Sequence, residues 1–80
     1  MEDIAARIRM ARLRAEMTQS QLADWIGVTR SVVANWEIRM RQKPNIINLI
    51  SIAIETGVSF ERIATGHGNI AYLIEGVKAH

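Results

Sequence analysis

The side chains that most often carry out chemistry in proteins are few in this sequence, and they are scattered. The two histidines, His67 and His80, lie 13 residues apart, and no carboxylate spacing beside them resembles a metal site. There is no cysteine, which excludes disulfides, thiolate metal sites and thiol nucleophiles. No serine lies in a nucleophile-elbow sequence, and Gly66-His67-Gly68 indicates a helix stop rather than a phosphate-binding loop. We therefore expect no enzymatic activity, no metal and no cofactor.

The distribution of charge along the chain is the stronger chemical signal. Residues 7–43 carry eight basic and three acidic side chains, a balance of +5, whereas residues 44–80 have a balance of −1. A basic half is expected where one face of a protein meets a polyanion such as nucleic acid. An ordinary solvated surface fits the same distribution, so charge alone leaves both interpretations open.

The length of 80 residues allows one compact domain and is too short for two. A domain of this size buries only about 60% of the surface of its unfolded chain, and oligomerisation is a common remedy for the resulting low stability. The longest apolar stretch, residues 46–54, is interrupted by Asn48 and Ser51 and falls far short of the roughly 20 residues of a membrane span. The acidic start lacks the basic region of a secretory signal. We therefore expect a soluble, cytoplasmic protein.

Apolar periodicity and capping residues predict two helices in the first part of the chain. Apolar residues recur at steps of three and four between residues 4 and 16, which predicts the first helix. Thr18 is expected to cap a second helix, with Gln21 completing a capping box. Gly27 supplies the left-handed residue that ends this helix after Ile26.

A third short helix follows directly. Thr29 is expected to cap a helix over residues 30–38, with Val33 and Trp36 facing inward. Trp36, and likewise Trp25 in the second helix, is interpreted as a core residue. Two short helices joined by a glycine-containing turn of about three residues form a helix-turn-helix.

The second half of the chain predicts two further helices and an extension. Pro44 marks the start of a mostly buried fourth helix over residues 45–56, and Ser59 caps a fifth over residues 60–65, which Gly66 ends. The last segment fits a helix capped by Asn69, although its apolar residues also alternate as in a strand; we favour the helix. The predicted fold is all-α, with a compact five-helix domain over residues 1–66 and a C-terminal extension over 67–80.

Residues 18–37 resemble the helix-turn-helix of the lambda repressor-like, Cro and xenobiotic-response-element family. The shared motifs are the Thr18-Gln19 start, the Leu22-Ala23 pair, the Gly27-Val28 turn and the Trp36-Glu37 end. The resemblance extends over about residues 4–66. It implies a five-helix domain that places its third helix in the major groove of DNA.

The resemblance assigns base reading to the first residues of the third helix. In this docking mode Arg30, Ser31, Val32 and, one turn later, Asn35 reach the base edges. Arginine suits guanine O6 and N7, and asparagine suits adenine N6 and N7. A phosphate contact is the alternative for Arg30, a contact to the DNA backbone alone is the alternative for Ser31, and simple exposure is the alternative for Asn35. Val32 either contacts a thymine methyl group or belongs to the inner face.

Contacts to the DNA backbone are expected at two helix starts. Thr18 and Gln19 begin the second helix, where free amides and the helix dipole attract a phosphate oxygen. The resemblance also implies that Gln19 supports Arg30. The loop before the fourth helix adds candidates that position the protein without reading sequence, namely Arg39, Arg41, Lys43 and Asn45. A solvated basic loop is the alternative for the three cations, and an ordinary polar residue at a helix start is the alternative for Gln19.

The resemblance further implies an ion pair between Arg12 and Glu37 that holds the scaffold under the third helix. One departure concerns the residues that follow this glutamate. The family usually has a glycine within two residues, whereas this chain has Ile38-Arg39-Met40. Either a non-glycine residue adopts the left-handed conformation there, or the third helix runs longer than usual.

These features predict a sequence-specific regulator of transcription that binds double-stranded DNA. The first hypothesis is a phage-type or bacterial repressor that binds a two-fold operator as a homodimer. An antitoxin that binds its toxin and represses its own operon is the second, and an adaptor without a DNA target is the third. The arginines around the third helix argue against the adaptor.

The C-terminal extension carries an apolar stripe that the five helices do not need. We expect it to form, with the fifth helix, an isologous homodimer interface. The residues of the stripe are Ile70, Leu73, Ile74 and Val77. A tail folded back on its own core is the alternative.

Overall fold

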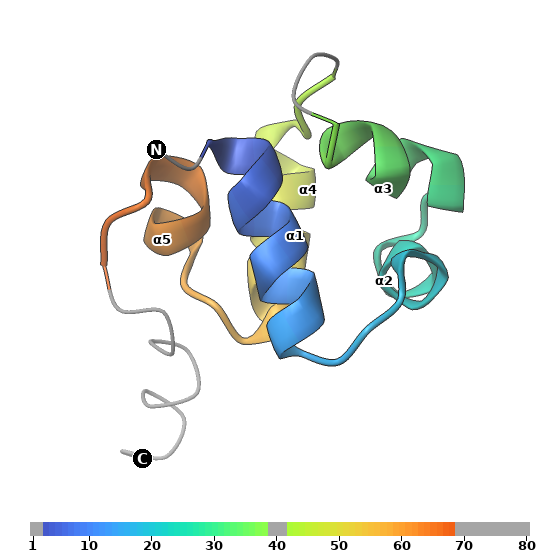
Figure 1. The fold of residues 1–80 in the computed structure, drawn as a ribbon, viewed down its shortest axis with the longest axis horizontal. Helices are drawn as coiled ribbons and strands as arrows, with labels where there is room; N and C mark the ends of the chain where they lie inside the picture. The colour runs from blue at the N-terminus through green and yellow to red at the C-terminus, as the bar shows by residue number, and fades with distance from the viewer. Residues whose placement is uncertain (1–2, 39–41, 69–80) are drawn as a thin grey trace.

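The computed structural model describes residues 3–38 and 42–68, which form five helices and contain no strand. The helices are α1 (Ile4–Arg14), α2 (Gln19–Ile26), α3 (Arg30–Trp36), α4 (Ile46–Thr56) and α5 (Phe60–Thr65). In Figure 1, α1 crosses the middle of the molecule in front of α4, with α5 on one side and α2 and α3 on the other. The all-α, five-helix architecture is therefore confirmed.

Side-chain caps define where each of these short helices starts. Every helix starts after a residue whose side-chain oxygen accepts a backbone N–H of the first turn, and these caps are Asp3, Thr18, Thr29, Asn45 and Ser59. At α2 the expected capping box is complete, since Thr18 Oγ1 accepts from Gln21 N at 3.0 Å and Gln21 Oε1 accepts from Thr18 N at 2.8 Å. Caps of this kind satisfy amides that have no partner within the helix.

Two helix boundaries differ from the expectation. α1 ends at Arg14 rather than Glu16, because Glu16 has a φ of 60° and so leaves the right-handed helical region. α4 begins at Ile46, one residue later than expected, because Asn45 has an extended backbone and serves as the cap. Pro44 consequently lies outside the helix, where it is buried.

The end of α3 also differs from the expectation. The α-helix stops at Trp36, two residues before the expected end, and Glu37 keeps a right-handed conformation with φ −87° and ψ −3°. The amides of Glu37 and Ile38 donate to carbonyls three residues back, each at 3.2 Å, so a tightened turn carries the chain to Ile38. The sequence left two alternatives to the family's usual glycine, a left-handed non-glycine residue or a longer third helix. Up to Ile38 the structure shows neither of them.

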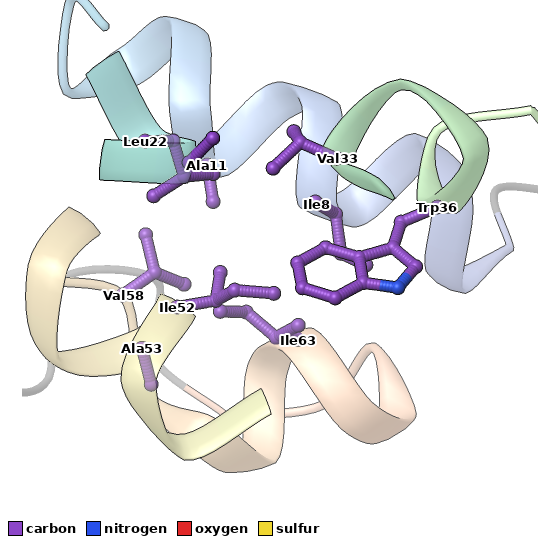
Figure 2. Packing of buried hydrophobic residues seen from close by; sticks show 10 residues of the cluster. Ile8, Ala11, Leu22, Val33, Trp36, Ile52, Ala53, Val58 and Ile63 are labelled. Atoms are coloured by element: carbon purple, nitrogen blue, oxygen red, sulfur yellow. The ribbon is translucent and has the colours of Figure 1, made fainter. Parts of the chain in front are cut away.

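The core draws on all five helices. Ile8, Leu22, Val33, Ile52 and Ile63, one from each helix, are fully buried and belong to one cluster. Figure 2 shows these side chains converging from surrounding helices on the same space. Because α3 contributes to this cluster, its orientation is fixed by the packing of the whole domain.

The two tryptophans have opposite environments. Trp36 is 3% exposed and closes one end of the core, as expected, whereas Trp25 is 66% exposed, so its interpretation as a core residue is wrong. α2 turns Leu22 and Ala23 fully inward and Ile26 partly inward. Since successive helical residues are rotated by about 100°, Trp25 lies well outside that inner face.

α4 is not the mostly buried helix that its composition predicts. Ile52, Ala53 and Thr56 are buried on one side, where α1, α2 and α5 pack against the helix. Its four other isoleucines are all exposed. None of the helices in the described part of the chain has the length and apolar character needed to cross a membrane.

Candidate nucleic-acid interface

The turn between α2 and α3 sets the direction of the third helix. Gly27 has a φ of 90°, a left-handed backbone conformation that is strained for residues with a side chain. Its amide donates to Ala23 O at 2.8 Å. Val28 N donates to the same carbonyl at 3.0 Å, and its side chain packs against the core. Thr29 then caps α3. The three-residue turn thus matches the helix-turn-helix that the sequence predicts.

The outward face of α3 carries polar side chains. Arg30, Ser31 and Asn35 are exposed, while Val33 and Trp36 are buried on the opposite side. These three expected base readers therefore share one accessible face. The fourth expected base reader, Val32, is partly buried, because its side chain packs against the core cluster.

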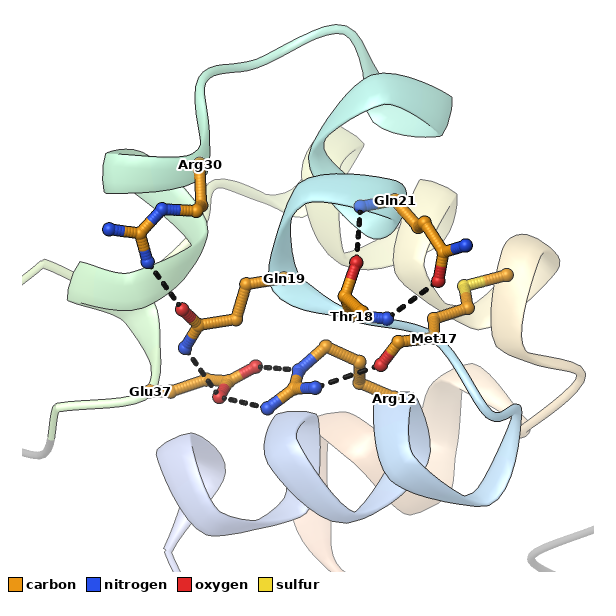
Figure 3. A network of polar contacts seen from close by, with 7 residues as sticks. All are labelled: Arg12, Met17, Thr18, Gln19, Gln21, Arg30 and Glu37. Atoms are coloured by element: carbon orange, nitrogen blue, oxygen red, sulfur yellow. Dashed lines mark hydrogen bonds and ion pairs between the residues drawn. The ribbon is translucent and has the colours of Figure 1, made fainter.

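A line of hydrogen bonds connects Arg30 to the interior of the domain. Arg30 Nη1 donates to Gln19 Oε1 at 3.0 Å, and Gln19 Nε2 donates to Glu37 Oε1 at 3.1 Å. Figure 3 shows the Gln19 side chain spanning the gap between the start of α2 and the end of α3. Gln19 thus supports Arg30, as the family resemblance implies, and it is itself supported by Glu37.

Arg12 holds Glu37 in a two-pronged ion pair. Arg12 Nε and Nη2 donate to the two Glu37 carboxylate oxygens at 2.7 and 2.9 Å, and Arg12 Nη1 donates to Met17 O at 2.8 Å (Figure 3). The two side chains are only 9% and 4% exposed. The hydrogen bond with Glu37 raises the pKa of Arg12 above its ordinary value, against the opposing effect of burial. The guanidinium therefore stays charged at physiological pH and ties α1 to the end of α3.

The residues expected to contact the DNA backbone lie in different places. Thr18 is exposed but uses its hydroxyl oxygen in the cap, and Asn45 is exposed with its Oδ1 accepting from Asn48 N at 2.8 Å. Lys43 is exposed just before α4, whereas Gln19 is half-buried in the network above. Two further expected backbone contacts, Arg39 and Arg41, lie outside the described residues. So does the apolar stripe expected to form the dimer interface, namely Ile70, Leu73, Ile74 and Val77.

Sequence reasoning missed the role of Arg7. Its Nε donates to Ile63 O at 2.8 Å and its Nη2 to Ala64 O at 3.1 Å, so it ties α1 to the end of α5. A single arginine among several in α1 gives no signal of such a contact. Arg7 and Arg12 thus act inside the fold, and the exposed cations of the described residues up to Lys43 are Arg9, Arg14, Arg30 and Lys43.

Comparison with known proteins identifies the family. A helix-turn-helix family matches residues 8–63, which is more than half of the chain. The protein therefore belongs to the lambda repressor-like, Cro-type helix-turn-helix family and is a DNA-binding regulator of this class. No curated protein and no solved structure matches it significantly. Within residues 3–38 and 42–68 there is no group of histidine and acidic side chains that could hold a metal ion.

Proposed function

We propose that the protein is a sequence-specific repressor of phage or bacterial type, which docks α3 in the major groove and binds a two-fold operator as a homodimer. The observation that carries this proposal is the support of Arg30 by Gln19 at the start of an exposed, polar helix face. A side chain held in place before binding loses less conformational freedom when it meets a base edge. Arg30 is therefore assigned to guanine.

The rest of the α3 face completes the proposed reading surface. Asn35 lies more than one turn after Arg30 on the exposed side, and its amide suits adenine N6 and N7. Ser31 is exposed between them in sequence and is assigned a lesser contact, with Val32 available only through the part of its side chain that the core leaves uncovered. Specificity in this arrangement depends mainly on Arg30 and Asn35.

Backbone contacts are proposed on either side of this reading face. Thr18 and Gln19 stand at the start of α2, and Lys43 and Asn45 stand before α4. Amides at a helix start and nearby cations favour phosphate oxygens. Arg39 and Arg41 belong to the same proposed set on sequence grounds. Two copies of the domain would present α3 to major grooves about 34 to 36 Å apart, which sets the spacing of the half-sites.

Selection of bound duplexes from random DNA, followed by titration against salt, tests the proposal. We expect a two-fold consensus and nanomolar-range binding, with log K falling against log salt by about 0.9 for each phosphate neutralised. Glu61→Gln, which alters an exposed acidic residue of α5, is the matched control and should leave the consensus unchanged. Failure to enrich any sequence, or binding that ignores salt, would rule out a sequence-specific repressor.

A further inference from the structure

The outward face of α4 is an apolar surface without a partner among the described residues. Ile46, Ile50 and Ile54 follow each other at steps of four and are 62%, 44% and 64% exposed, and Ile47 beside them is 70% exposed. We name these four residues the isoleucine ridge. α1, α2 and α5 pack against the other side of the helix, so nothing within residues 3–38 and 42–68 covers the ridge.

The chemistry of the ridge excludes a highly charged occupant. Its four side chains are aliphatic, and the only charged residue of α4, Glu55, is rotated by about 100° from Ile54. The ridge exposes on the order of 400 Å² of apolar area, which is as large as the largest patch on a typical monomer. DNA, whose outer surface is charged, makes no favourable contact with such a surface. Another uncharged apolar surface does, because pairing removes both surfaces from water.

The spacing of the ridge is symmetric about its centre. Ile46 and Ile54 each lie four residues from Ile50, on opposite sides of it. If a two-fold axis passes beside Ile50, two antiparallel copies of α4 bring Ile46 of one copy against Ile54 of the other. Helices that cross at the angle of about 20° common in helical bundles, with axes 8 to 10 Å apart, keep such side chains in contact over this length. The ridge is therefore complementary to a second copy of itself.

We propose that the isoleucine ridge of α4 is the homodimer contact and that its occupant is the ridge of a second copy of this chain. Two ridges of this size bury on the order of 800 Å² together, less than the about 1,200 Å² at the lower end of standard specific interfaces, so the dimer is weak and concentration-dependent. The link to a two-fold operator rests on the proposed function, whereas pairing of the ridges does not require DNA.

Sedimentation equilibrium on the full chain tests the contact. The wild-type mass should rise with concentration from 9.0 kDa towards twice that value. Ile50→Glu places two carboxylates at the two-fold axis, and we expect it to raise the dimer dissociation constant by at least about tenfold. The matched control is Leu13→Glu on α1, because Leu13 is 49% exposed and lies off the ridge; it should leave the dissociation constant unchanged. Circular dichroism verifies that each variant is folded.

A charge exchange tests the antiparallel register itself. Ile46→Lys and Ile54→Glu should each weaken the dimer, and the double variant should restore it, because the new charges meet only between copies. Within one helix they are eight residues, or about 12 Å, apart, too far to pair directly. A double variant no better than the single ones overturns the antiparallel pairing.

Two other outcomes overturn the ridge as the contact. If Leu73→Glu dissociates the dimer while Ile50→Glu does not, the C-terminal extension is the dimer contact. If the wild-type chain stays at 9.0 kDa at every concentration, no dimer forms through any surface. The proposed reading function is tested separately with the same variant. If α3 reads DNA as proposed, monomeric Ile50→Glu should bind a single half-site duplex as tightly as the wild type does.

Discussion

Gln19 and Glu37 are joined by a 3.1 Å hydrogen bond from the Gln19 amide nitrogen to the Glu37 carboxylate. The carboxylate only accepts, so it turns the amide nitrogen of Gln19 towards itself and leaves the amide oxygen facing Arg30. In the reverse orientation the Gln19 amide would present donors to a guanidinium that has no acceptor. Glu37 thus orients the support of the proposed base reader.

Gln19→Ala should weaken binding to the selected operator in a way that depends on Arg30. The loss should be about 1 kcal/mol, the net value of a typical hydrogen bond, because Arg30 is no longer held in place. In an Arg30→Ala background the same substitution should cost little more. Fluorescence anisotropy on the four proteins of the cycle measures this coupling. Ser20→Ala, which alters the neighbouring exposed residue, is the control. If the binding losses of Gln19→Ala and Arg30→Ala simply add, Gln19 does not act through Arg30.

A second prediction concerns the contribution of the Arg12–Glu37 ion pair to the free energy of unfolding. Glu37→Ala should lower the free energy of unfolding by about 3 to 5 kcal/mol, because it leaves the buried Arg12 guanidinium without its carboxylate. Replacing both residues, as in Arg12→Met with Glu37→Leu, should cost much less, since no buried charge remains unpaired. Urea unfolding of the three proteins gives the comparison. A double variant less stable than Glu37→Ala contradicts it.

Local signals in the sequence predicted the helix starts well. Thr18, Thr29 and Ser59 are caps because their side-chain oxygens reach amides three residues ahead, a property of the adjacent chain alone. Gly27 ends α2 for an equally local reason. The same kind of signal fails at Glu16, which adopts a left-handed conformation although its residue type does not favour it.

Features that depend on the placement of neighbouring helices could not be predicted. α4 is apolar around most of its circumference, with Asn48, Ser51 and Glu55 gathered on one side, so its composition does not show which of its isoleucines α1, α2 and α5 leave uncovered. The resemblance implied both that Gln19 supports Arg30 and that Arg12 pairs with Glu37. It did not show that Gln19 also contacts Glu37, because that hydrogen bond joins residues 18 positions apart across two helices.

The two tryptophans should respond oppositely to truncation. Trp36→Ala should lower the free energy of unfolding by about 3 to 5 kcal/mol, because it empties a buried site in the core. Trp25→Ala should change it by no more than about 0.5 kcal/mol, as is usual for exposed positions. Chemical denaturation followed by circular dichroism compares them without depending on tryptophan fluorescence. Similar losses for both would place Trp25 in the core after all.

Glu16→Gly should stabilise the protein. A side chain in the left-handed region costs roughly 1 to 2 kcal/mol, and glycine removes this cost while adding part of it back as unfolded-state entropy. We expect a net gain of about 0.5 to 1 kcal/mol, or a few degrees in Tm for a domain of this size. Arg14→Gly, in the right-handed last turn of α1, is the control and should lower Tm. A fall in Tm for Glu16→Gly would show that its side chain contributes more than the strain costs.

Arg30→Ala and Lys43→Ala should separate base reading from backbone contact. Arg30 lies on the outward face of α3, so its loss should cost about 1 to 3 kcal/mol on the selected operator and relax the preference at one base pair. Lys43 lies before α4, so its loss should weaken all duplexes about equally and reduce the salt slope by about 1. Titration of each variant against the operator and its single-base substitutions distinguishes the two effects. If both variants relax the same base position, Lys43 reads sequence as well; if neither does, Arg30 contacts phosphate, the alternative that the sequence left open.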